Sequence, residues 1–283
     1  MSVSTISALE RTKFVDEMKE DFERNESLLK KCCRSDGLMA GSTIKWDVVG
    51  LSDEATTRTR NGDIPEGQLA LSQVTATAKE HFMKYRLDSF DAFRTNPNVR
   101  GAQYKKVVAA TNRAIDKEII TQLDTATVQV NSGSAVSFAT LATFLTWTTT
   151  LWANDVPNDG RVWGVLTPKA YGQMLRINEF KSSDFITVRP MENGIPAMGF
   201  RRWLDVNWIT HTGLTGTGTA TASCFIFHES ALGHQIAGDP EVHAYYYEPQ
   251  DRSEVWAKVW HAAKLCLPRG VVEAVHDDTA AFA

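Results

Sequence analysis

Apolar and polar residues alternate from Thr43 to Val49, and this period of two predicts a half-buried strand. A long polar stretch then runs from residue 56 to residue 67, where the Asn61-Gly62 pair favours a tight reversal of the chain. A return limb follows from Gln68 to Phe90. Since an excursion this polar cannot build a core of its own, we expect neighbouring subunits to cover it. The pattern therefore indicates assembly rather than catalysis.

Residues 4–34 combine many charges with apolar side chains at helical spacing, which predicts an amphipathic helix. Two interpretations of this helix stay open. It is either an ordinary surface helix or an N-terminal arm that packs along another subunit. The apolar stripe consists of Phe14, Met18, Phe22 and Leu29.

A second periodic segment predicts a long helix from about Val99 to Thr125. At about 1.5 Å per residue this helix would reach roughly 40 Å. It is longer than most helices of globular proteins, and long enough to organise two subdomains. Its apolar positions recur at steps of three and four residues: Tyr104, Val108, Ile115, Ile119 and Leu123.

The rest of the chain predicts two further helices and a series of strands. Ser137 is expected to cap a helix that continues through Trp152. Residues 161–166 read as a buried strand, after which Thr167 is the expected N-cap of a helix with Pro168 at its first position. Residues 213–223 are expected to form a surface turn or flexible loop. The other expected strands are residues 203–210, 224–228, 242–247, 254–265 and 271–276.

Composition excludes several classes of protein. The chain has 283 residues, of which 43% are hydrophobic and 23% charged, so it can bury a sizeable core. A net charge of −4 argues against the concentrated basic face that nucleic-acid phosphates require. The cysteines, with Cys32 and Cys33 adjacent, match neither a disulfide framework nor a metal clip. Signal-peptide and membrane-spanning patterns are also lacking, so we expect a cytoplasmic protein.

Candidate chemistry is sparse. His228, His234 and His243 lie close in sequence among acidic residues, but their spacing matches no strong metal motif. The glycine-rich stretch from Gly213 lacks the ending of a phosphate-binding loop and leads into a strand. We therefore expect no catalytic residue, no cofactor and no metal.

Paired aromatic residues in the last third allow two interpretations, a base-stacking platform or ordinary core packing. Core packing is the commoner reason for such pairs, and the acidic net charge also favours it. The residues concerned are Trp203, Trp208, Tyr245, Tyr246, Tyr247, Trp256 and Trp260.

Taken in order, these features resemble the major capsid proteins of tailed bacteriophages with the HK97-type fold. The stretch from Val162 to Leu175, VWGVLTPKAYGQML, is similar to that family's strand-then-helix element. Residues 225–233, FIFHESALG, resemble an element in which a strand ends in a short turn, and residues 253–272 resemble the closing hairpin of the central domain. Each element is degenerate alone, so the resemblance rests on their order and spacing over essentially the whole chain.

The resemblance implies an α+β, HK97-like capsid fold with peripheral and axial subdomains. It assigns residues 1–41 to an N-terminal arm and residues 42–95 to an extended β-hairpin loop, the E-loop. Residues 96–196 would form the long spine helix and the peripheral domain. Residues 197–283 would form the axial domain and the closing strands of the peripheral domain.

The function that the resemblance implies is structural and not enzymatic. The chain would assemble as hexamers and pentamers into an icosahedral shell enclosing double-stranded DNA, and the shell would form in the host bacterial cytoplasm. Expected partners are further copies of the chain, a separate scaffolding protein, a portal protein and packaged DNA bound without sequence specificity. No membrane is involved. A separate scaffold is expected because only about forty residues precede the loop here.

The extended loop is expected to overlie a neighbouring subunit and to contact it through its tip. Exposed ion pairs there would each contribute only ~0–1 kcal/mol, but symmetry repeats them many times. Some members of the family join subunits by a lysine–asparagine bond. Because no lysine lies between Lys45 and Lys79, we expect no covalent crosslink at the tip. The expected contact residues are Arg58, Arg60, Asn61, Asp63 and Glu66.

Three alternatives remain at this stage. An encapsulin-like compartment shell would share the fold but enclose cargo enzymes. A soluble metal-dependent enzyme would use the three histidines named above. A tail or tube protein would assemble into cylinders rather than closed shells.

Overall fold

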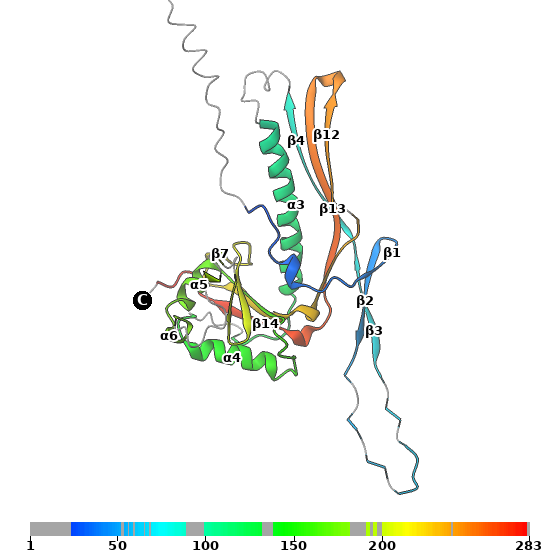
Figure 1. Cartoon of the computed structure of the whole chain (residues 1–283), viewed down its shortest axis with the longest axis vertical. Helices are drawn as coiled ribbons and strands as arrows, with labels where there is room; N and C mark the ends of the chain where they lie inside the picture. Colours follow the sequence, from blue (N-terminus) through cyan, green and yellow to red (C-terminus); the bar gives the residue numbers. More distant parts are fainter. Residues whose placement is uncertain are drawn as a thin grey trace, which may run out of the picture. The chain divides into compact units, whose positions relative to one another are not determined.

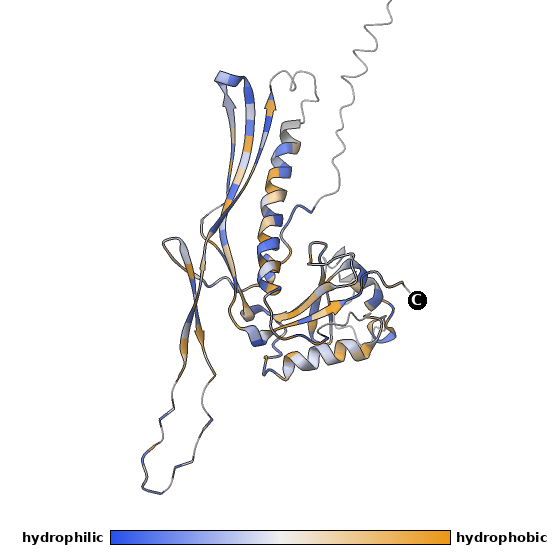
Figure 2. Ribbon diagram, turned by 180° about the vertical axis from the view of Figure 1, so that it is seen from behind, coloured by the Kyte–Doolittle hydropathy of each residue, from blue (hydrophilic) through white to orange (hydrophobic). Residues whose placement is uncertain are grey.

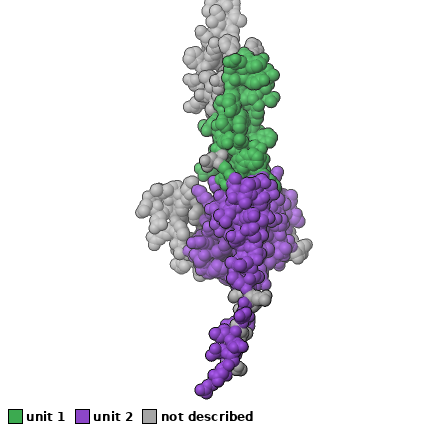
Figure 3. All heavy atoms as spheres, turned by 90° about the vertical axis from the view of Figure 1, so that its right-hand side faces the viewer, with its two compact units in different colours: residues 1–27, 79–116, 236–261 green, residues 28–78, 117–235, 262–283 purple. Residues whose placement is uncertain are grey.

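The computed structural model describes residues 24–51, 54–55, 57–58, 60–64, 66–67, 69–88, 99–131, 138–181, 191–192, 195–196, 200–238 and 240–281. The chain divides into two compact units (Figure 3). Unit 1 consists of residues 1–27, 79–116 and 236–261, and unit 2 consists of residues 28–78, 117–235 and 262–283. No helix among the described residues is long and apolar enough to span a lipid bilayer.

A five-stranded mixed sheet forms the centre of unit 2 (Figure 1). Its strand order is β14-β10-β5-β9-β8, in which β5 and β9 are parallel and the other neighbours are antiparallel. All side chains of β10 except that of Ser223 are buried, as expected for a strand covered on both faces. The strands are β5 (Val162–Leu166), β8 (Phe200–Trp203), β9 (Val206–Thr210), β10 (Ala222–His228) and β14 (Val271–His276).

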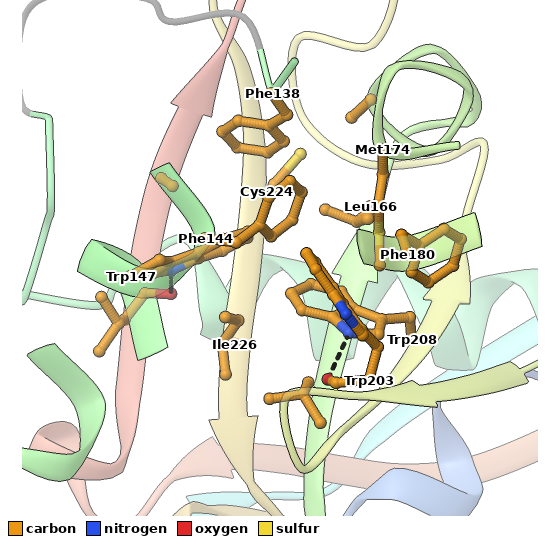
Figure 4. Packing of buried hydrophobic residues seen from close by; sticks show 14 of the residues in the cluster. Phe138, Phe144, Trp147, Leu166, Met174, Phe180, Trp203, Trp208, Cys224 and Ile226 are labelled. Atoms are coloured by element: carbon orange, nitrogen blue, oxygen red, sulfur yellow. Dashed lines mark hydrogen bonds between the residues drawn. The ribbon is translucent and has the colours of Figure 1, made fainter. Parts of the chain in front are cut away.

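Aromatic side chains fill the core beside this sheet (Figure 4). The helix α4 (Leu141–Trp152) packs on β10 and β14, and the ring of its Phe144 meets that of Trp208 edge-on at 5.3 Å. Both buried indole N–H groups are satisfied, because Trp147 donates to the Val272 carbonyl at 3.1 Å and Trp208 donates to the Trp203 carbonyl at 3.0 Å. The expectation that Trp203 and Trp208 belong to the core is therefore confirmed.

The predicted cap at Thr167 is confirmed as well. Its hydroxyl oxygen accepts a hydrogen bond from the Ala170 N–H at 3.1 Å, and Pro168 occupies the first position of the helix α5 (Pro168–Met174). The same hydroxyl donates to Asp278 at 2.7 Å, which ties the start of α5 to the chain beyond β14. A short helix α6 (Asn178–Lys181) follows.

A three-stranded sheet, β1-β2-β3, contains the predicted hairpin. Its strands are β1 (Leu38–Ala40), β2 (Thr43–Val49) and β3 (Leu71–Thr77). Ile44 and Trp46 on β2 are fully buried. A Cβ placed on Gly37 or Gly233 would lie 2.7–2.8 Å from the Ile44 side chain or the Trp46 ring, so both glycines are needed for this close approach. Trp46 therefore fixes the root of the hairpin within unit 2.

The return limb differs from the prediction of one continuous limb from Gln68 to Phe90. It consists of β3 and a second strand, β4 (Lys79–Asp88), with Ala78 between them. Only β3 pairs with β2, whereas β4 pairs with β13 (Arg252–Leu265). The partner of β4 lies far away in the sequence, so alternation alone could not separate the two strands.

Unit 1 contains β4, β12 (Glu241–Tyr247), most of β13 and the greater part of the helix α3 (Val99–Leu123). Strand β13 pairs antiparallel with β12 on one side and with β4 on the other. One face of this sheet is apolar and packs on α3. The packed side chains are Val107, Val255 and Ala257, with Met83, Tyr85 and Val242 partly buried beside them. The remaining short elements are β6 (Met191–Glu192), β7 (Ile195–Pro196), β11 (Leu232–Ile236) and the 3-10 turns η1 (Lys30–Cys32), η2 (Glu229–Ala231), η3 (Glu248–Gln250) and η4 (Pro268–Gly270).

The predicted helix over residues 4–34 is wrong in its described part. Residues 1–23, with Phe14, Met18 and Phe22, lie outside the described residues. From residue 24 to residue 34 the only helical turn is η1. The backbone of Arg34 bonds to Leu232 at 3.0 Å and to His234 at 2.9 Å, so pairing with β11 holds Arg34 in an extended bridge. Local helical periodicity does not reveal such a distant partner.

Two other predicted boundaries also differ. The helix predicted to start at Ser137 begins at Leu141 with Thr140 as its N-cap, and Ser137 lies outside the described residues. The single strand predicted over residues 203–210 is divided by a turn at Leu204 and Asp205, whose φ angles are 52° and 59°. Two left-handed residues make a tight hairpin turn. Leucine rarely adopts this conformation, so the turn could not be predicted from residue types.

Candidate assembly surfaces

The hairpin of unit 2 is regular near its root. The β2–β3 ladder runs from the Thr43–Thr77 pair to the Val49–Leu71 pair, and the Gly50 N–H donates to the Ala70 carbonyl at 2.7 Å just beyond it. No strand occurs among the described residues from 51 to 70. Asn61 has a left-handed φ of 68°, as predicted for a reversal at an Asn-Gly pair.

The five residues predicted for the loop tip all lie in this distal stretch and are all exposed. Their side chains project from a segment without strand pairing, so nothing in the ladder hides them. The structure therefore places them where a neighbouring molecule could reach them. They are Arg58, Arg60, Asn61, Asp63 and Glu66.

Sequence reasoning overlooked the aliphatic side chains of the hairpin. Leu51, Ile64 and Leu71 are 68%, 75% and 73% exposed, and Val49 and Leu69 are more than half exposed. Apolar residues are visible in orange on both limbs in Figure 2. Large aliphatic side chains gathered on one projecting element indicate a surface that another molecule covers. These aliphatic residues could have been found from the sequence, because they stand out within a mostly polar stretch.

A cavity of about 500 Å³ in unit 2 lies beside the outer end of the β2–β3 ladder. Residues Val48–Leu51 line one side, and the chain after α4 and the turn η4 line others. His228 also reaches this cavity, but its Nδ1 lies 2.7 Å from the Ser230 hydroxyl and its Nε2 lies 3.0 Å from Asp159. Because both ring nitrogens already have partners, His228 is not poised to bind a metal.

The three histidines of the metal hypothesis have separate surroundings. His234 and His228 belong to unit 2, whereas His243 belongs to unit 1 and lies 3.2 Å from Glu241. Among the described residues, no group of three or more histidine, cysteine or acidic side chains is arranged to hold a metal ion. All four cysteines are buried thiols, and none of them forms a disulfide.

The glycine-rich stretch after Gly213 is a structured turn, in agreement with the prediction. Gly216 and Gly218 have φ angles of 74° and 80°. The Gly218 N–H donates to Asp278 at 2.9 Å, and Thr215 donates to Asp124 at 2.6 Å. The Gly218 N–H and the Thr215 hydroxyl thus already donate to carboxylates of the chain, so these two donors are not available to a bound anion.

The second face of the sheet in unit 1 carries aromatic side chains. The ring of Trp256 lies 4.6 Å from that of His243 and 6.3 Å from that of Tyr245. Tyr245 is 53% exposed and Trp260 is 40% exposed. The expectation of core packing is therefore wrong for Tyr245 and Trp260, because α3 packs on the opposite face of the sheet. Tyr246 and Tyr247 are exposed as well.

Ion pairs lie beside these rings. Glu254 contacts Lys84, and its carboxylate lies 2.7 Å from Arg252 and 3.2 Å from Arg86. Hydrogen bonding from Lys84 is the main cause that lowers the pKa of Glu254, and Lys258 does the same for Glu241. Aromatic residues and arginine are enriched at protein interfaces.

Comparisons with known proteins agree with this geometry. The family model described as "Phage capsid protein" matches residues 6–278. No curated protein matches the chain in sequence. Among solved structures, the capsid of cyanophage Pam1 is similar with a TM-score of 0.69 and 13% identity, over 99% of both chains. A structure from Mycobacterium phage Che8 has a TM-score of 0.64 and 17% identity over 95% of this chain and 97% of that one.

A third similar structure, the capsid of cyanophage P-SCSP1u, has a TM-score of 0.66 and 9% identity over 93% of this chain and 91% of that one. The likeness in fold extends over nearly the whole chain in all three cases, and the family match names a phage capsid protein. These findings do not support the compartment-shell, tube or metal-enzyme alternatives. The chain belongs to the phage capsid protein family, with the HK97-like α+β fold, and is a major shell subunit of an icosahedral tailed-phage capsid.

Proposed function

We propose that the extended loop of each shell subunit, residues 42–95, lies over a neighbouring subunit and carries the main lateral contact. The exposure of Leu51, Ile64 and Leu71 is the observation on which this proposal rests. The fully buried Trp46 supports it, because a fixed root lets a projecting hairpin hold its direction. Apolar contacts along the limbs would supply the affinity. Ion pairs of Arg58, Arg60, Asp63 and Glu66, together with Asn61, would select the partner surface.

The remaining segments take the other roles of a shell subunit. Residues 1–41 form an arm whose stripe of Phe14, Met18 and Phe22 packs along another copy. Residues 96–196 provide the spine helix and the peripheral domain. Residues 197–283 provide the axial domain, which meets the symmetry axes, and the closing strands of the peripheral domain. The length of α3 supports this division, since 25 residues extend about 38 Å at 1.5 Å each.

The shell consists of hexamers and pentamers and encloses double-stranded DNA without sequence-specific binding. The net charge of −4 supports this role, because a wall that bound phosphate tightly would hinder packaging and release. A separate scaffolding protein guides assembly, and a portal protein occupies one vertex.

Electron microscopy of the chain purified from the cells that naturally make it tests the enclosed content. Closed particles containing DNA are the expected result. Protein-filled shells or open tubes would contradict it.

The loop contact is tested with Arg60→Glu, matched by Arg176→Glu at an exposed arginine outside the hairpin. We expect Arg60→Glu to lower the yield of closed shells several-fold, because it reverses a charge at the contact. Unfolding of the dispersed chain should stay unchanged, and Arg176→Glu should assemble normally. Wild-type shell yield from Arg60→Glu would overturn the loop-tip contact.

A further inference from the structure

A buried carboxylate on α3 fixes residues 24–27 of the N-terminal arm. Asp116 has a fully buried side chain, and both of its oxygens accept from residues of one short segment. Its Oδ2 lies 3.2 Å from the Arg24 guanidinium, and its Oδ1 accepts from the Ser27 hydroxyl at 2.5 Å. A buried charge is tolerated only when paired and hydrogen-bonded, so this carboxylate favours the attached state of the segment.

A second side chain of α3 supports the same attachment. Asn112 donates from its Nδ2 to the Asn25 carbonyl at 2.7 Å. Residues 112 and 116 are four apart, which places them on the same face of the helix. Side chains on one helix face therefore bind residues 24, 25 and 27 in turn, and all of these residues belong to unit 1.

We propose that Asp116 is a positioning residue for shell assembly, because it holds the point at which the N-terminal arm leaves the subunit. Residues 1–23 of the arm precede Arg24, so fixing residues 24–27 on α3 restricts the directions in which these preceding residues can reach a neighbour. An arm tethered close to its target binds at a higher effective concentration than a freely rotating one. The inference rests on the proposed packing of the arm on another copy.

The attachment itself is tested by proteolysis of the dispersed full-length chain. A glutamate-specific protease cuts after the exposed Glu26, which lies inside the attached segment, and substitutions at basic residues leave its target sites intact. Cleavage of such a segment follows the population of its open state. Hydrogen bonds to charged groups are among the stronger ones, so we expect Arg24→Gln to raise the cleavage rate after Glu26 about ten-fold. Lys31→Gln, at an exposed lysine in η1, is the matched control and should leave the rate unchanged.

The positioning role is tested by assembly of the same variants. Arg24→Gln should give fewer closed shells with a wider range of diameters, while its unfolding midpoint stays close to that of Lys31→Gln. Arg24→Lys keeps the charge and should restore most of the assembly. Because Arg24 and Asp116 act as a pair, adding Arg24→Gln to Asp116→Asn should have little further effect on cleavage.

Two outcomes of the cleavage and assembly experiments would overturn the proposal. Cleavage equal to that of Lys31→Gln would show that Arg24 does not hold the segment, whatever happens to assembly. Faster cleavage with unchanged shells would show that holding the segment does not position the arm. The proposed packing of the arm is judged separately, by replacing Phe14, Met18 and Phe22 together with serine. Normal shells from that variant would remove the arm contact while leaving the cleavage result intact.

Discussion

In the five-stranded sheet of unit 2 the apolar side chains of β10 are covered on both faces. In the hairpin β2–β3, by contrast, the apolar side chains become more exposed from the root towards the end of the ladder. Ile44 and Trp46 are fully buried near the root, but Val49 and Leu71 at the end of the ladder are 59% and 73% exposed. The sheet completes its core within one chain, and the distal hairpin does not. Folding stability should therefore depend on the sheet, and assembly on the hairpin.

Truncation in the core of the sheet should have the largest effect on folding. Trp208→Ala removes a fully buried ring that contacts Phe144 and Trp147, so we expect the free energy of unfolding to fall by about 3–5 kcal/mol. Urea denaturation followed by tryptophan fluorescence measures the change. A loss below about 1 kcal/mol would mean that this core is not the main source of stability.

Overpacking at the root of the hairpin should have an intermediate effect. Gly233→Ala places a Cβ 2.7 Å from the Trp46 ring and 3.0 Å from the Cys266 sulfur, so the ring must shift. The expected loss of stability is about 1–3 kcal/mol, as for other overpacked sites. Gly218→Ala tests backbone strain alone, since a Cβ there meets nothing within 4 Å at a φ of 80°. Equal stability of Gly233→Ala and the wild type would show that the root is loosely packed.

Acid should weaken the core of unit 2 before it weakens the sheet of unit 1. Burial lowers the pKa of His276 below its ordinary 6.5, although the nearby Asp278 and Asp277 raise it. The folded chain then binds this proton less readily than the unfolded chain, so stability falls as the pH drops below about 6.5 towards the folded pKa. The lowered pKa of Glu254 stabilises the fold above its ordinary 4.5, and this contribution is lost only as the pH falls further, through the folded pKa.

The pH dependence is measured by urea denaturation between about pH 7.5 and about pH 5.5. This window includes the ordinary pKa of histidine but lies above the ordinary pKa of glutamate. His276→Gln should reduce the slope of stability against pH in this window. An unchanged slope in the variant would assign the acid sensitivity to another group.

Polar substitution on the distal hairpin should have the smallest effect on folding. Leu71→Ser changes a side chain that is already 73% exposed, so the free energy of unfolding should change by less than about 0.5 kcal/mol. The fraction of chain recovered in shells on density gradients should nevertheless fall, because the substitution removes apolar area from the contact. Normal shell recovery would falsify the division of roles between hairpin and sheet.

The sequence was informative where structure is local. The bounds of α3 were predicted within two residues, and the cap at Thr167 and the strand Val271–His276 were correct. Each of these follows from periodicity or from one side-chain hydrogen bond. The five tip residues could likewise be placed in the excursion from its polarity alone.

Distant pairing accounts for what the sequence did not reveal. The change of partner at Ala78 depends on β13, more than 170 residues later, and the extended path at Arg34 depends on β11. The exposed rings of β12 and β13 have the same alternation as a core strand, so only the position of α3 decides which face is covered. The attachment at Asp116 joins residues 89 positions apart and carries no local signature.

The burial of the thiols bears on what happens after the particle leaves the cell. Thiol–disulfide exchange requires the thiolate, and burial raises the pKa of Cys224 to about 12 and also raises that of Cys266. Near neutral pH only about one Cys224 in 10⁵ is then ionised. A shell of many copies brings many thiols into a small volume, and the outside of the cell is oxidising. Because these two thiols are rarely ionised, Cys224 and Cys266 should stay reduced on either side of the host membrane.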